Sequence, residues 1–123
     1  MDGKIASATQ KLDEALKAAT DAAVELQRLL PEHQGVPHYS VIEQAAHEVG
    51  VRLSCLIQRQ HVSNIAAEAG PKAKCPRCQK LCDVDCRTRI VKSIDGEVEM
   101  IEAKARCSRC ERDFFPSTHE VGV

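Results

Sequence analysis

Six of the seven cysteines in this 123-residue chain lie between residues 75 and 110, and four of them form two Cys-x-x-C pairs. The first pair is Cys75 and Cys78, and the second is Cys107 and Cys110. In a Cys-x-x-C turn both sulfurs leave the same side of a short loop, whose backbone N–H groups can donate to the thiolates. Two such turns supply four thiolates and close the metal to solvent. The spacing therefore predicts a structural Zn²⁺ site that does no chemistry, because a catalytic zinc keeps one position open for water.

Other uses of these cysteines remain open. Iron in a rubredoxin-like site has the same four-sulfur geometry, so iron is the alternative metal. A disulfide framework is disfavoured by the odd number of cysteines and by the lack of a secretory signal, which together indicate a reducing compartment. Cys75-Pro76-Arg77-Cys78 alone could serve as a thioredoxin-type redox pair. That pair needs a βαβ context, however, and would leave the second Cys-x-x-C pair unexplained.

Three further cysteines need an interpretation. Cys82 and Cys86 could complete one local cluster with Cys75 and Cys78, but that grouping leaves the second pair without partners. We interpret Cys82 and Cys86 as ordinary ribbon residues near the metal, and Cys55 as a small core residue on a helix. A surplus thiol could still exchange with a ligand or oxidise.

Composition limits what can hold such a site in place. The chain has 1 Tyr, 2 Phe and no Trp, so its core must be built from Leu, Ile, Val and Ala. A small domain with few aromatic residues needs a covalent or metal staple, which the predicted zinc supplies for the C-terminal third. The net charge of −1 marks no global attraction to nucleic acid or membrane. No apolar run is long enough to cross a bilayer, so we expect a cytoplasmic protein without membrane contact.

Two helices are predicted before the cysteines. Apolar residues spaced three and four apart indicate a first helix over about 2–30, which ends before Pro31. Residues 31–39 contain two prolines and one glycine and read as a loop. Ser40 and Glu43 have the spacing of a capping box at the start of a second helix over about 40–69, which Gly70-Pro71 ends. The apolar stripes of the two helices are expected to face each other in an antiparallel hairpin, or to pair between chains in a dimer. Their members are Ile5, Leu12, Leu16, Ala19, Ala23, Leu26 and Leu30 in the first helix, and Ile42, Ala46, Val49, Leu53 and Leu56 in the second.

The fold class is therefore α+β, with a helical hairpin over 1–70 and a zinc ribbon over 71–123. Asp95-Gly96 is a signal for a type I′ turn, flanked by alternating segments at 87–94 and 97–106. If these two residues are central in the turn, Lys92 lies opposite Glu99 and Arg89 lies opposite Glu102. The same register places Ile90 opposite Ile101 and Val91 opposite Met100. Phe114-Phe115-Pro116 is expected to cover this hairpin.

Histidines are not predicted to bind the metal. His47 and His61 lie on the second predicted helix, far from the cysteine pairs, and an exposed helical histidine is the simpler interpretation. His119 is a weak alternative ligand, since four cysteines already fill a tetrahedron.

Positive charge gathers beside the two cysteine turns. Residues 1–70 carry 6 Lys and Arg against 9 Asp and Glu, whereas residues 71–123 carry 11 against 9. A phosphate backbone could meet this part of the chain, although a four-thiolate zinc site itself carries a charge of about −2. The candidate nucleic-acid contacts are Lys72, Lys74, Arg77, Lys80, Arg109 and Arg112, with Arg106 beside them.

Several of these segments together resemble a known family. They are Cys-Pro-Arg-Cys at 75–78, Leu81-Cys82, Arg-Thr-Arg at 87–89, Asp95-Gly96, Val98-Glu99, Cys-Ser-Arg-Cys at 107–110 and Arg-Asp-Phe-Phe-Pro at 112–116. Over about residues 71–118 the chain is similar to the N-terminal zinc-binding region of Kra-type insertion-sequence transposases. The resemblance implies a DNA-binding or assembly module that precedes a ribonuclease-H-like catalytic domain. Because the sequence stops at Val123, we expect a truncated or stand-alone piece of a mobile-element protein without transposition chemistry.

Two function classes follow from the sequence. One is a nucleic-acid-binding zinc ribbon that binds duplex DNA and is oriented or dimerised by its helices. The other is a zinc-stapled interaction module, with the helices as its contact surface for itself or another protein. An enzyme is not expected, because no paired carboxylates, nucleophile–base set or phosphate-binding loop is present.

Overall fold

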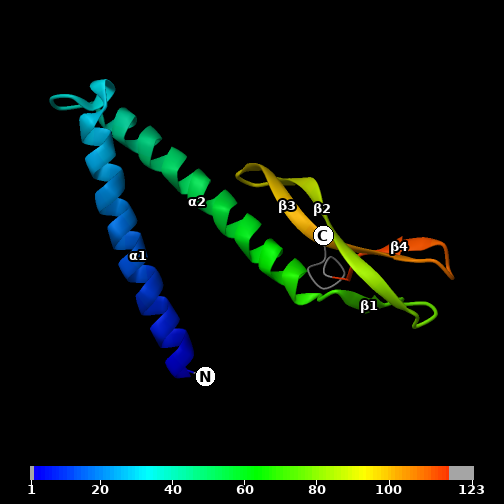
Figure 1. The fold of residues 1–123 in the computed structure, drawn as a ribbon. Coiled ribbons are helices and arrows are strands. Elements are labelled where there is room, and N and C mark those ends of the chain that lie inside the picture. The colour runs from blue at the N-terminus through cyan, green and yellow to red at the C-terminus, as the bar shows by residue number, and fades with distance from the viewer. Residues whose placement is uncertain (1, 117–123) are drawn as a thin grey trace. The chain divides into compact units, whose positions relative to one another are not determined.

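The computed structural model describes residues 2–116, which form two helices followed by a four-stranded antiparallel sheet (Figure 1). This confirms the predicted α+β class. By their contacts the residues form two compact units, one up to Val51 and one from Arg52 onward. The boundary lies inside the second helix, whereas the division predicted at residue 70 marks the change from helix to strand. None of the described helices is long and apolar enough to cross a membrane.

In the first unit, α1 spans Asp2–Leu29 and the short 3₁₀ helix η1 spans Pro31–His33. An uninterrupted run without proline, rich in alanine, favours the long helix, and Pro31 ends it because proline cannot continue the hydrogen-bond ladder. No residue of α1 is buried. Most of its predicted stripe is exposed, with Ile5 at 64% and Leu12 at 54%, and Ala23 is half-buried. The apolar stripe of α1 is therefore present in the helix but is not buried.

Helix α2 spans Tyr39–Glu68, close to the predicted range, but its cap differs from the prediction. The helix begins before Ser40, so Ser40 lies within the first turn and the predicted capping box with Glu43 does not form the start. Instead, Nδ1 of His38 accepts a hydrogen bond from the Ser40 backbone N–H at 3.1 Å. A histidine ring thus takes the role that a Ser or Asp side chain usually has at a helix N-terminus.

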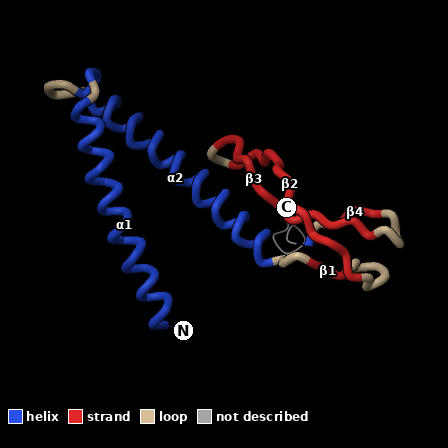
Figure 2. Tube along the Cα trace, in the orientation of Figure 1, coloured by secondary structure: helices blue, strands red, loops and turns tan. Residues whose placement is uncertain are grey.

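The second unit contains the sheet, whose strand order is β1-β2-β3-β4. The strands are β1 (Lys72–Lys74), β2 (Leu81–Ser93), β3 (Gly96–Cys107) and β4 (Arg112–Phe114). The long β2–β3 hairpin is the centre of the sheet, and the two short strands flank it near the cysteines (Figure 2). The short strands therefore bring the start and the end of the ribbon to the same end of the hairpin.

The register of the β2–β3 hairpin differs from the prediction by two residues. Lys92 lies opposite Glu97, and Arg87, rather than Arg89, lies opposite Glu102. The turn is centred on Ile94 and Asp95, because Ser93 pairs with Gly96. A type I′ turn needs positive φ at both central residues. Only Gly96, at +110°, has positive φ in this segment, so a type I′ turn centred on Asp95-Gly96 is not formed. A slip of two residues keeps every side chain on its predicted face, since strand side chains alternate.

Side chains on both sides of the turn explain this register. The Ser93 hydroxyl donates to the Gly96 carbonyl at 2.8 Å and accepts from the Asp95 backbone N–H at 3.2 Å. The Asp95 carboxylate accepts a hydrogen bond from Ser54 of α2, and Gln58 donates to the Ser93 hydroxyl at 3.5 Å. The C-terminal part of α2 thus holds the hairpin turn by polar contacts that periodicity does not reveal.

The two phenylalanines of the predicted aromatic cover contact the sheet at different places, and Phe114 does so as part of the edge strand β4. Phe114 pairs with Ala105 and packs against the buried cysteines. The Phe115 ring lies under the Arg87 guanidinium, with 4.4 Å between the guanidinium carbon and the ring centroid. Arg87 also donates from Nε to Glu102 at 2.5 Å. Phe115, Arg87 and Glu102 therefore form one stacked and charged contact on the sheet.

Candidate metal centre

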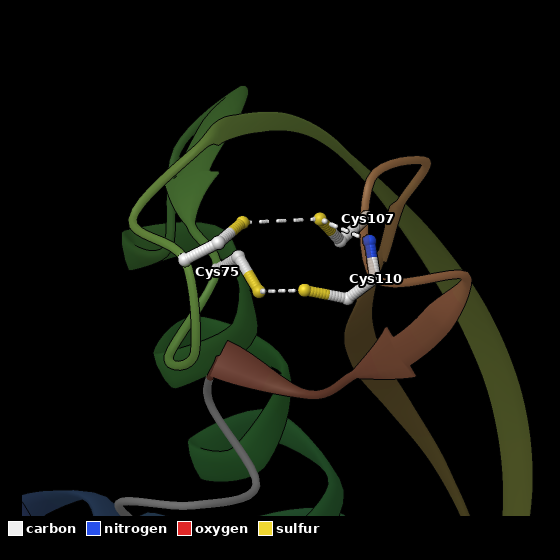
Figure 3. Close-up of side chains that lie close together, drawn as sticks. Cys75, Cys107 and Cys110 are labelled. Atoms are coloured by element: carbon white, nitrogen blue, oxygen red, sulfur yellow. Dashed lines mark hydrogen bonds between the residues drawn. The ribbon is translucent and has the colours of Figure 1, made fainter.

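The four predicted ligands come together at the end of the hairpin. The ligand sulfurs of Cys75, Cys78, Cys107 and Cys110 all lie within 4.8 Å of one another. The Cys78 and Cys107 sulfurs are 3.5 Å apart, and the Cys75 and Cys110 sulfurs are 3.8 Å apart. Figure 3 shows the sulfurs of Cys75 and Cys110 pointing toward each other from the two cysteine turns. This group of four could hold a metal ion, as the spacing predicts.

The two cysteine turns, which we call the knuckles (75–79 and 107–111), have a left-handed residue at the equivalent position. The residue after the second cysteine has positive φ in both, Gln79 at 65° and Glu111 at 52°. In the first knuckle the Gln79 N–H donates to the Cys75 carbonyl at 2.9 Å, which closes the loop. A left-handed conformation costs a residue other than glycine about 1–2 kcal/mol. Each knuckle therefore has one strained residue directly after its second cysteine.

Backbone N–H groups stabilise the first sulfur of each knuckle. In the second knuckle the Cys110 N–H donates to the Cys107 sulfur at 3.4 Å, and this bond is the main reason that the pKa of Cys107 is lowered to about 6. In the first knuckle, N–H groups of Cys78 and Arg77 lower the pKa of Cys75. The knuckles thus favour thiolates at two of the four positions. Such N–H donors are the contacts expected around sulfurs that bind a metal.

The sulfur of Cys110 shows the cost of grouping several thiols without a cation. Hydrogen bonding with Cys78 and then burial raise the pKa of Cys110 to about 12. Four thiolates in so small a volume repel one another strongly unless a cation lies among them. A divalent metal that prefers sulfur removes this repulsion, so the donor set fits Zn²⁺ and equally the iron of a four-sulfur site.

Metal binding is expected to strengthen as the pH rises. Because thiolates and not thiols bind the metal, Cys110 must lose its proton on binding, whereas Cys107 has lost its proton above about pH 6. We expect the apparent affinity for Zn²⁺ to rise by about tenfold or more per pH unit between about pH 6 and pH 8. Competition with a chromophoric chelator, corrected for the pH dependence of the chelator itself, measures this. An affinity that is constant over this range would contradict the thiol ligand set.

The other cysteines and the histidines lie outside this group of four. Cys82 is buried and packs in one core with Cys75 and Cys107, so it lies beside the four-cysteine group. Cys86 is exposed, and Cys55 lies on α2 with its sulfur 3.7 Å from the Asp95 carbonyl oxygen. His47 and His61 are exposed on α2. His119 lies outside the described residues.

The predicted nucleic-acid contacts divide into two sets. Lys72 forms an ion pair with Asp83, and Lys80 donates to the Ser108 hydroxyl at 2.5 Å, which links the two knuckles. Arg106 pairs with Asp113 at 3.2 Å, and its hydrogen bond lowers the pKa of Asp113. The second set is exposed and has no ion pair or side-chain hydrogen bond with any residue from 2 to 116. Its members are Lys74, Arg77, Arg109 and Arg112.

Sequence reasoning did not find the Lys80–Ser108 link or the position of Cys82 beside Cys107. Both depend on the hairpin register, which brings the start of β2 next to the end of β3. In the predicted register, the start of β2 is shifted by two residues relative to the end of β3, so neither contact is expected. The only sequence signal for the observed register is Ser93, whose hydroxyl holds the turn.

Comparisons with protein-family models, with curated proteins and with solved structures find no match to this chain.

Proposed function

We propose that the chain from residue 71 is a zinc ribbon whose metal is structural and whose knuckle surface binds duplex DNA. In this proposal the ribbon is the DNA-binding or assembly part of a transposase-like protein and has no catalytic activity of its own. The four-cysteine group supports the metal, since it offers four sulfurs and leaves no position for a substrate. Metal analysis of the purified protein distinguishes zinc from iron.

The exposed cations of the knuckles are the observation that supports DNA binding. Arg77 lies between the two cysteines of the first knuckle, and Arg109 lies between those of the second. Lys74 precedes the first knuckle and Arg112 follows the second. Each is exposed and makes no ion pair within residues 2–116, so each is available to a phosphate. Because the metal site joins the knuckles, these four charges are held as one group. Phosphate contacts of this kind position a protein on DNA without reading its sequence.

Replacing Arg77, Arg109 and Arg112 together by alanine is expected to weaken DNA binding and its dependence on salt. Each lost phosphate contact lowers the slope of log K against log salt by about 0.9, so the triple variant should lose about 3 units of slope. Fluorescence anisotropy with a short duplex, titrated between about 50 and about 200 mM salt, measures both affinity and slope.

A matched control variant distinguishes the effect of the knuckle cations from the effect of a lower net positive charge. Lys4, Lys11 and Lys17 are exposed on α1, so replacing them by alanine removes the same three charges away from the knuckles. The control variant should keep the slope of the wild type. Equal losses in both variants would contradict a site at the knuckles, and an absence of binding even at low salt would contradict DNA binding altogether.

One observation favours a second function, that of a zinc-stapled interaction module unrelated to DNA. Helix α1 buries none of its residues, although Ile5, Leu12 and Leu16 follow one stripe along it. Exposed apolar stripes of this kind are common at protein contact surfaces. A chain that fails to bind DNA at low salt but associates through α1 would support this second function, with the helices contacting either a second copy or another protein.

A further inference from the structure

A fifth thiol lies in the same buried cluster as the metal site. Cys82 is 5% exposed and packs in one core with Cys75, Cys107 and Ala105. It does not belong to the four residues whose ligand atoms lie within 4.8 Å of one another. Cys82 is therefore a thiol that the metal does not need but that touches its ligands.

The strand register places Cys82 beside one particular ligand. The β2–β3 ladder ends with the pair Val84 and Ala105, and Cys82 and Cys107 each lie two residues beyond this last pair. Both residues lie within the strands, and their side chains are in the same core. A disulfide requires about 4.4–6.8 Å between Cα atoms, so it needs two cysteines that are close neighbours in the same core, as Cys82 and Cys107 are.

The position of Cys82 is fixed by a second contact, because its sulfur donates to the Lys80 carbonyl at 3.3 Å while it packs in one core with Cys107. A groove lined in part by Lys80, Cys82 and Ser108 reaches this side of the site. Cys82 lines the groove directly and Ser108 follows Cys107 in the chain, so a small oxidant in the groove comes next to the two cysteines. The two other cysteines outside the ligand set lack this position, since Cys86 is exposed opposite Ala103 and Cys55 lies on α2.

We propose that Cys82 is a resolving thiol, which forms a disulfide with Cys107 when hydrogen peroxide or another peroxide oxidises the site, and thereby releases the metal. The proposal rests on the proposed metal binding. In the first step the Cys107 thiolate attacks one peroxide oxygen, the O–O bond breaks, and a sulfenic acid and hydroxide form. In the second step the Cys82 sulfur attacks the sulfenic sulfur, the S–O bond breaks, and the lost hydroxyl group leaves with the Cys82 proton as water. The two sulfurs supply the two electrons that reduce the peroxide.

When Cys107 is no longer a thiolate, only three cysteine ligands remain to bind the metal, and the metal is released. A disulfide between two ligands is the competing product, since the Cys78 and Cys107 sulfurs are 3.5 Å apart. Cys82 differs from the ligands because no metal bond has to break before it reacts. Its disulfide is also reversible by thiols, which protects Cys107 from the irreversible sulfinic and sulfonic states.

The test uses the zinc-loaded full chain treated with hydrogen peroxide. A zinc indicator follows metal release, and peptide mass spectrometry after alkylation maps the disulfides. We expect a Cys82–Cys107 disulfide to form together with zinc release, and zinc to bind again after reduction with a thiol. In Cys82→Ser, peroxide should carry Cys107 to sulfinic acid, and the zinc bound again after reduction should fall severalfold. Cys86→Ser, the same substitution on the exposed cysteine of β2, should behave as the wild type.

Other outcomes distinguish a failure of the resolving role of Cys82 from a failure of the proposed metal site. A Cys78–Cys107 or Cys75–Cys110 disulfide with Cys82 still free, in a chain that bound zinc beforehand, overturns the resolving role but leaves the metal site standing. A chain purified without metal overturns the proposed metal site instead. Peroxide then still tests the pairing in the metal-free chain, where the absence of a Cys82–Cys107 disulfide overturns it. The wild-type disulfide map decides these outcomes even if Cys82→Ser fails to fold.

Discussion

Removal of the metal by a chelator is expected to unfold the sheet formed by β1 to β4. The buried apolar residues of the sheet are few, and three of them are Cys75, Cys82 and Cys107. Val98 and Met100 are buried as well, but they lie toward the turn of the hairpin and not at the knuckles. Structural zinc in small modules contributes about 10–16 kcal/mol of apparent binding free energy, which in these modules is also folding free energy. A core of this size does not replace that contribution.

Amide hydrogen exchange of β2 and β3, with and without chelator, measures this effect directly. Protection in both strands should collapse on chelation and return when zinc is added. Cys107→Ser should show the same loss without chelator, because the serine oxygen is a poor substitute for a fully buried thiolate. Cys86→Ser is the matched control, since Cys86 lies on the same hairpin but is exposed. A sheet that stays cooperatively folded in chelator would show that the four cysteines are not a structural metal site.

Replacing Arg87 by alanine is expected to destabilise the zinc-bound sheet by about 1–3 kcal/mol. Glu102 is a buried carboxylate, and Arg87 donates to it at 2.5 Å while its guanidinium lies over the Phe115 ring. The substitution therefore removes a charge partner of a buried group and a cation–π contact at once. Because Arg87 is itself 41% exposed, solvent screens part of the interaction and the expected value stays below that of a fully buried pair.

Urea unfolding of the zinc-saturated protein measures the loss of stability. Arg89→Ala is the matched control, because Arg89 approaches Glu102 only to 3.7 Å and contacts no aromatic ring within residues 2–116. Its expected cost is below about 1 kcal/mol. Arg87→Lys should be intermediate, since lysine keeps the charge but loses the planar group that stacks on Phe115. Equal costs for Arg87→Ala and Arg89→Ala would show that the geometry at Arg87 makes no special contribution.

For the β2–β3 hairpin, local sequence signals predicted the faces of the strands but not their pairing. Alternation along the strands predicted which side chains share a face, and the two-residue slip left those faces unchanged. The pairing partners were wrong, because Asp95-Gly96 indicates a type I′ turn while the Ser93 hydroxyl stabilises a turn one residue earlier. The contacts of Ser54 and Gln58 with this turn join residues about 40 positions apart in the sequence. No pattern of period 2 or 3.6 encodes such contacts.

For the helices, the sequence predicted the bounds but not which face is buried. Spacing, alanine content and Pro31 predicted both helices to within about one or two residues, since these are local backbone preferences. Burial of a helix face depends instead on what lies against it. The predicted stripe residues Leu53 and Leu56 of α2 are exposed, while Ser54, Cys55 and Gln58 make its polar contacts with the hairpin turn.

The sequence by itself determined the four-cysteine group. The two Cys-x-x-C loops flank one antiparallel hairpin, whose two ends lie next to each other, so the four sulfurs are brought together. It also determined the α+β order, the helix bounds and the excess of positive charge near the knuckles. Only the tertiary structure decided which of those cations are paired and which are exposed, and that Cys82 lies beside Cys107. The physical reason is that pairing and burial depend on the register between strands, which is set by the contacts of one turn and not by the residues that the register brings together.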